Sequence, residues 1–110
     1  MNKKNIEFIV STWSNGKPTK KGSGLGIRIE KKDRDKYFDN SIHEIDLTMD
    51  SKIYNIKITH GFWENCPELR DKSIGLFLIK YNIHEWVSRK TNKLILEKID
   101  NKSFILRHKD

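Results

Sequence analysis

Histidine and cysteine are the side chains in this sequence that could do metal or nucleophilic chemistry, and both are sparse. The four histidines, His43, His60, His84 and His108, are spread one to a segment and form neither an H-E-x-x-H motif nor an H-x-x-x-H pair. His43 and His60 could meet across a hairpin with Cys66 nearby, which would supply three ligands for a metal ion. Lone histidines on mixed faces are more often structural, so the pattern predicts no metal site.

Cys66 and the EKK segment at residues 30–32 are the other candidates for catalysis. Cys66 stands among aromatic residues, which disfavour a thiolate, so a buried structural thiol is expected. The EKK segment matches the E-x-K part of a metal-dependent nuclease site. Such sites need a further acidic residue, usually upstream, and Glu7 is the only acid that precedes the segment. We therefore predict no catalytic residue and no cofactor.

Composition limits the class of protein. The chain has 110 residues, of which 35% are hydrophobic and 34% charged, as expected for a single globular domain spanning residues 1–110 with one modest core. One cysteine excludes an internal disulfide and favours a reducing compartment. The N-terminal residues lack the apolar segment of a secretory signal, and the longest apolar run, residues 74–79, is too short to span a bilayer. A cytoplasmic location is expected.

Positive charge is concentrated at the two ends of the chain. The formal net charge is +7, and residues 1–32, 33–88 and 89–110 carry +6, −3 and +4. A basic surface built from both ends would attract phosphate backbones through counterion release. The alternative is compositional bias, because the chain lacks alanine and glutamine and is rich in lysine, isoleucine and asparagine.

The stretch from Gly61 to Tyr81 is the part against which the other elements must pack. Its apolar residues at 74, 77, 78 and 81 follow helical spacing, so a helix is expected there. Pro67 suits the first turn of a helix, which predicts a short helix that begins there, with Asn65 or Cys66 as the cap before it. Phe62, Cys66 and Leu69 would face the core through that helix, and Ser73 would cap the second one.

Alternating residues predict strands elsewhere. The expected strands cover 5–13, 25–30, 43–49, 54–60, 94–99 and 104–106, with a tight turn at Asp50-Ser51 and a single helical turn capped by Asp33. Ile6 is expected on one strand face with Phe8 and Val10, His43 on one side with Ile45, Leu47 and Met49, and Tyr37 and Phe38 are expected to turn back toward the core. We predict an α+β fold in which about six mostly antiparallel strands form a barrel-like or strongly curved sheet with one or two helices packed on it.

The segment SNGKPTKKGSGLG, residues 14–26, has neither the G-x-G-x-x-G nor the P-loop spacing of phosphate-binding loops. It is either a flexible hairpin connection or a lysine-bearing arm that contacts nucleic-acid phosphates.

Four segments of the sequence follow one another in the same order as the elements of a known fold. They are GLGIRIEKKDRDKYF, HEIDLTMDSKIYNIKI, HGFWENCPELRDKSIGLFLIKY and LILEKIDNKSFILR. Over residues 24–107 the chain resembles the pseudobarrel DNA-binding domain of plant B-three transcription factors and of the effector domains of some type II restriction endonucleases. The helical pattern at residues 74–81 departs from that plan, in which a strand is expected.

The resemblance implies that two loop-and-strand arms grip the major groove of a duplex, with Arg28 and Arg34 as readers of guanine and the lysines on phosphates. The implied nucleic-acid-binding residues are Lys17, Lys20, Lys21, Arg28, Lys31, Lys32 and Arg34 in the first arm, and Arg89, Lys90 and Lys93 in the second.

Three functions follow, in order of preference. The first is a small non-catalytic accessory or regulatory protein that binds nucleic acid, with DNA favoured over RNA. The second is a protein-binding inhibitor or adaptor, as mobile elements encode, anchored by exposed Trp13, Trp63 or Trp86. An enzyme is third, and would need a deep pocket in which two of His43, His60, Glu64 and Cys66 converge.

Overall fold

Seven strands, two α-helices and one 3-10 helix make up the fold in the computed structural model, which describes residues 5–65, 67–84 and 91–108. The α+β prediction is confirmed. The elements, in chain order, are β1 (Ile6–Ser14), β2 (Leu25–Arg28), α1 (Lys31–Tyr37), β3 (Glu44–Met49), β4 (Lys52–Lys57), η1 (His60–Trp63), β5 (Glu68–Arg70), α2 (Lys72–Lys80), β6 (Lys93–Lys98) and β7 (Ser103–His108).

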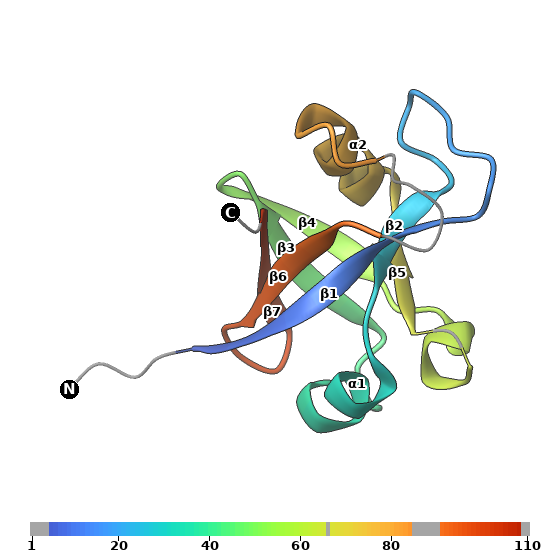
Figure 1. Ribbon diagram of the computed structural model, residues 1–110. Helices are drawn as coiled ribbons and strands as arrows, with labels where there is room; N and C mark the ends of the chain where they lie inside the picture. Colours follow the sequence, from blue (N-terminus) through green and yellow to red (C-terminus); the bar gives the residue numbers. More distant parts are fainter. Residues whose placement is uncertain (1–4, 66, 85–90, 109–110) are drawn as a thin grey trace.

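The strands form one sheet in the order β4-β3-β7-β6-β1-β2-β5, and its two outer strands, β4 and β5, contact one another. The sheet is therefore a nearly closed barrel (Figure 1). Every neighbouring pair is antiparallel except β3 with β7, which run parallel with Leu47 opposite Phe104. The strand that the sequence did not predict is β5.

The core fills the inside of the barrel. The residues that alternate on β2 and β3 are buried as one face, Phe8 and Val10 are buried on β1, and alternate residues of β6 and β7 are buried too. Ile6 is an exception at 45% exposed, because it lies at the first position of β1, and His43 is exposed just before β3. These two residues therefore do not share the burial of the residues with which alternation grouped them.

Helix α1 covers one end of the barrel. Phe38, the residue after the helix, is buried and stacks on Phe104 with ring centroids 4.6 Å apart. Tyr37 stacks on Phe8 at 4.8 Å, as the inward turn of these two aromatics predicted. The expected cap was wrong, since Glu30 occupies the N-cap position and Asp33 lies within the helix.

Helix α2 covers the opposite end (Figure 1). Ile74, Phe77 and Leu78 are buried, which confirms the helical pattern. The cap differs from the prediction. Asp71 is the N-cap and its carboxylate accepts a hydrogen bond from the backbone N–H of Ser73 at 3.0 Å, so Ser73 is the donor. The helix ends at Lys80 with Tyr81 as its C-cap, and the following Asn82, whose φ is 56°, allows the Ile83 N–H to reach the Leu78 carbonyl.

The short helix predicted around Pro67 is absent. Residues 68–70 form β5, in which Leu69 is buried as a strand residue, and Phe62 reaches the core from η1. The extended backbone allows β5 to pair with β2, with Leu69 opposite Ile27. Cys66 lies outside the described residues. The predicted hairpin is confirmed, because β3 and β4 are antiparallel and Asp50 and Ser51 both have positive φ, as a two-residue hairpin turn requires.

The loop between β1 and β2 is packed against α2. A Cβ placed on Gly75 would lie 1.9 Å from the carbonyl oxygen of Gly22, and a Cβ on Gly22 would lie 2.5 Å from the carbonyl oxygen of Lys72. Both contacts are with backbone, which cannot move aside as a flexible side chain can. This contact fixes the loop of residues 15–24 beside the first turns of α2. None of the described helices is long and apolar enough to cross a membrane.

Replacement of Gly75 by alanine is predicted to destabilise the protein by about 1–3 kcal/mol, because the added methyl group overlaps the backbone of Gly22. The same change normally stabilises a helix interior by about 0.5–1 kcal/mol. Urea denaturation followed by circular dichroism measures the difference. Gly61→Ala is the control, since a Cβ there meets nothing within 4 Å. A Gly75→Ala variant more stable than the wild type would contradict this packing.

Candidate nucleic-acid interface

The outer surface of β1, β2 and β5 carries a row of polar side chains in register. Ser11 lies opposite Lys93 on one side and Arg28 on the other, and Arg28 lies opposite Glu68. The Lys93 ammonium donates to the Ser11 hydroxyl at 2.9 Å. One row across four strands therefore presents two cations, Lys93 and Arg28.

The Arg28 side chain on β2 is held by Glu68 on the neighbouring strand β5. Its Nε and Nη2 donate to the same carboxylate oxygen at 3.1 and 2.5 Å. The Glu68 side chain is 6% exposed while that of Arg28 is 53% exposed. A buried carboxylate thus orients a guanidinium whose remaining N–H donors face solvent, the arrangement required for bidentate contact with a phosphate or a guanine edge.

A second row presents Arg70. Trp13 lies opposite Gly26, and Gly26 lies opposite Arg70, so a glycine separates the two large side chains. The Arg70 guanidinium lies over the Trp13 ring, 5.2 Å from its centroid. Gly26 is buried and has no room for a Cβ, which would lie 2.4 Å from the Leu69 carbonyl oxygen. The exposed arginine is therefore supported by a flat aromatic surface.

Two hollows lie at the ends of this face. One, of about 380 Å³, lies beside the loop of residues 15–24 and includes Trp13, Thr59, Arg70 and Lys72 in its lining. The other, of about 300 Å³, lies at the end of β2. The residues that line it are Ser11, Arg28, Ile29, Glu30, Lys31, Asn65 and Pro67.

The predicted lysines occupy the two rims. Lys17, Lys20 and Lys21 are exposed on the loop of residues 15–24, at the α2 end, and Lys31 and Lys32 are exposed on α1, at the other end (Figure 1). The loop is a hairpin connection with hydrogen bonds of its own, including Thr19 Oγ1 to Ser23 Oγ at 2.6 Å. We call the surface formed by Lys17, Lys20, Lys21, Arg28, Lys31, Lys32, Arg70, Lys72 and Lys93 the basic face.

Arg34 is not part of this surface, although the sequence placed it among the guanine readers. Its side chain is 9% exposed, and its Nη1 donates to the backbone carbonyls of Phe62 and Glu64 at 2.9 and 3.0 Å. The guanidinium also lies 5.7 Å from the centroid of the Trp63 ring. Arg34 therefore fastens η1 to α1, and is not available to a nucleic acid.

The remaining predicted residues divide into two groups. Lys93 lies on the basic face from β6, while Arg89 and Lys90 lie outside the described residues. Trp13, Arg70 and Lys72 were missed, because only the pairing of β5 with β2 brings Arg70 over Trp13. Trp13 and Trp63 are half-buried rather than exposed, and Trp86 is not described.

The side chains considered for catalysis that the structure describes are exposed. His60 Nε2 lies 2.8 Å from Glu64, but the His60 side chain is 91% exposed. Glu30 and Lys32 form an exposed ion pair at 3.5 Å. Across residues 5–65, 67–84 and 91–108, no three His, Cys, Asp or Glu side chains are arranged to hold a metal ion.

Comparison with known proteins gives no match: no protein-family model, no curated protein and no solved structure is similar enough to this chain to assign a relationship.

Arg34→Leu is predicted to destabilise the protein by about 2–4 kcal/mol, because two carbonyls that the guanidinium satisfies lose their donor. Amide exchange at Phe62 and Glu64 should accelerate with it, since η1 loses its attachment to α1. Chemical denaturation and hydrogen exchange measure the two effects. Lys32→Leu, an exposed change on the same helix, serves as the control. Equal stability of the two variants would disprove this role for Arg34.

Proposed function

We propose that this protein binds nucleic acid, in the first place duplex DNA, through the basic face, and that it acts without catalysis as an accessory or regulatory factor. The observation that carries the proposal is the pair of oriented, solvent-facing arginines between two lysine-bearing rims. Arg28 is held by Glu68 and Arg70 by Trp13, so both guanidinium groups are already positioned before a ligand arrives. The nearly closed sheet is compatible with the pseudobarrel that the sequence resembles.

Each part of the face would have a different task. The lysines on the two rims would neutralise phosphates and so set affinity without sequence preference. Arg28 and Arg70 lie between the two rims and would approach the major groove of the DNA. There a guanidinium can form two hydrogen bonds with guanine. The acidic groups of this region are already engaged, because Glu68 accepts from Arg28, Glu30 pairs with Lys32 and Asp71 caps α2.

Titration of a fluorescent random-sequence duplex at about 50 and about 200 mM salt tests the proposal. Affinity should fall steeply with salt, with a log–log slope of about −0.9 for each phosphate neutralised. A variant with Lys20, Lys21 and Arg28 changed to alanine should bind more weakly and with a shallower slope. The matched control removes Lys98, Lys102 and Arg107, which also comprise two lysines and one glutamate-paired arginine, but from β6, β7 and the turn between them.

Equal weakening by both triple variants would mean that net charge alone drives the binding, and would refute the assignment to the basic face. Absence of binding at about 50 mM salt would refute the function itself.

A second candidate, a protein-binding inhibitor or adaptor, is favoured by one observation. The outer surface of the sheet also carries β-branched residues in adjacent strands, with Ile9 opposite Ile95, and Thr48 opposite both Ile105 and Ile53. Ile53 is 70% and Ile9 41% exposed. Exposed apolar residues in one region are typical of a contact surface. This candidate would be established instead if the wild type captured a protein partner that the double variant Ile9→Lys, Ile53→Lys did not capture, and if the wild type did not bind DNA.

A further inference from the structure

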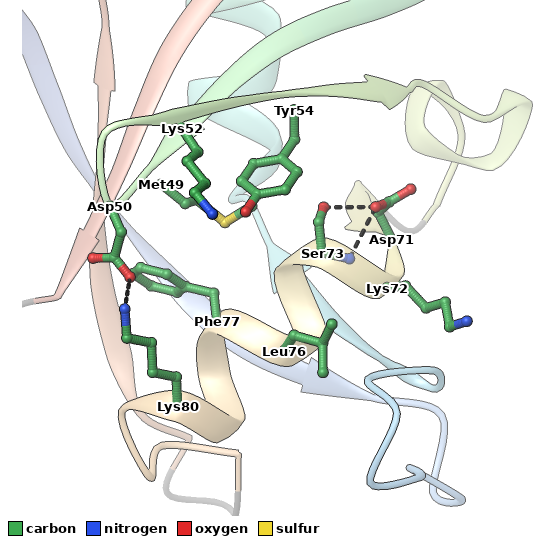
Figure 2. A pocket seen from close by; sticks show the side chains of 10 residues that line it. All are labelled: Met49, Asp50, Lys52, Tyr54, Asp71, Lys72, Ser73, Leu76, Phe77 and Lys80. Atoms are coloured by element: carbon green, nitrogen blue, oxygen red, sulfur yellow. Dashed lines mark hydrogen bonds and ion pairs between the residues drawn. The ribbon is translucent and has the colours of Figure 1, made fainter.

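A cavity of about 470 Å³ lies between the β3–β4 hairpin and α2, and the proposed function makes no use of it. Figure 2 shows that Lys52 and Tyr54 extend from β4 toward α2, while Phe77 extends from α2 toward the hairpin. A volume of this size is in the range of pockets that hold small molecules.

The cavity has an apolar and aromatic floor. Met49 is 2% and Phe77 6% exposed, and Tyr54, partly buried, packs against the same core. Leu76, which is 49% exposed, contributes the apolar edge on the α2 side. Two aromatic rings, a thioether and a leucine suit a flat apolar group.

The two carboxylates at the rim are already engaged. Asp50 accepts hydrogen bonds from the Lys80 ammonium at 2.7 Å and the Tyr81 hydroxyl at 2.5 Å, which together hold the pKa of Asp50 below its usual value. Asp71 accepts from the backbone N–H and the hydroxyl of Ser73 at 3.0 and 2.6 Å. Asp50 is thus paired with a cation, while Asp71 is held at the N-cap of α2, where the helix dipole stabilises its charge.

Lys52 is the cation that remains. Alternation along β4 places Lys52 and Tyr54 on the inner side of the strand, with Lys52 opposite Met49 and Tyr54 opposite Leu47. Among the described residues no carboxylate lies within ion-pair distance of Lys52. Lys72 also lines the cavity, but its side chain extends away from it in Figure 2. The cavity thus combines an aromatic floor with one uncommitted ammonium group.

We propose that this cavity binds a small aromatic monocarboxylate, with the carboxylate on the Lys52 ammonium and the ring against Phe77 and Leu76. One negative charge fits, because Lys80 is paired with Asp50 and Lys72 extends away, which leaves Lys52 as the single lysine of the lining that can receive a carboxylate. The Tyr54 hydroxyl is placed on the same strand to donate a second hydrogen bond to the carboxylate. Lys52, Tyr54 and Phe77 are not part of the basic face, so this site and the proposed function stand or fall separately.

Titration of the ¹⁵N-labelled protein with 2-naphthoate, followed by NMR, tests the site. We expect saturable binding of one molecule with a dissociation constant on the order of 1 mM or below. The amide signals that shift should be those of Met49, Tyr54, Leu76 and Phe77. Naphthalene-2-carboxamide, which has the same ring system without the charge, should bind about tenfold more weakly.

Lys52→Gln should weaken 2-naphthoate binding about tenfold and leave the carboxamide unaffected. The matched control is Lys57→Gln, because Lys57 lies on the same strand but on its outer side, where it pairs with Glu44. Equal affinity for acid and amide, equal weakening by both variants, or signals that shift elsewhere would each overturn the proposal, as would failure of 2-naphthoate to bind. The comparison of acid with amide uses the wild-type protein, so it does not depend on the folding of any variant.

Discussion

The position of Phe38 is the constraint on which one half of this structure depends. Its ring stacks on Phe104 and meets Phe62 edge-on at 5.1 Å and Phe8 at 6.4 Å, so three distant segments of the chain are joined to α1 through one side chain. Arg34 lies one helical turn earlier on α1. Because Phe38 fixes that helix, the Arg34 guanidinium is held where it can donate to the carbonyls of Phe62 in η1 and of Glu64 just after it. The aromatic contact in the core thereby sets the path of a surface segment.

A comparable arrangement holds the other end. Ile74 and Leu78 bury α2 in the core, and the contact between Gly75 and Gly22 then sets the loop of residues 15–24. Each rim of the basic face is therefore attached to a helix that closes an end of the barrel. The spacing between the rims follows from the short length of β2, which connects them. Such a face can be positioned before binding, which reduces the entropy lost when a ligand orders it.

Much of the fold could be predicted from the sequence because its signals are local. Alternation identified the strands that bury Leu25, Ile27, Ile45 and Leu47, and helical spacing identified α2. The misses have non-local causes. Strand β5 has three residues, too few to show alternation, and its extended form depends on pairing with β2. The parallel pairing of β3 with β7 joins two distant segments, so no local sequence pattern indicates it. Arg34 is surrounded by charged neighbours in sequence, so nothing local separates it from the exposed lysines of α1.

The arginines show why partners, rather than net charge, locate a binding surface. Arg34 uses its donors on two backbone carbonyls and Asp35, and Arg107 lies between Glu7 and Glu97. Arg28 has a single carboxylate partner on one edge of its guanidinium, and Arg70 rests on an aromatic ring, which takes none of its N–H donors. A guanidinium whose donors are occupied must break those bonds to contact a phosphate, and that exchange gains little free energy. Arg28 and Arg70 lack this penalty and lie on neighbouring strands, and this shared position, more than the net charge of +7, is the reason for proposing the β2–β5 side of the barrel as the surface that contacts a polyanion.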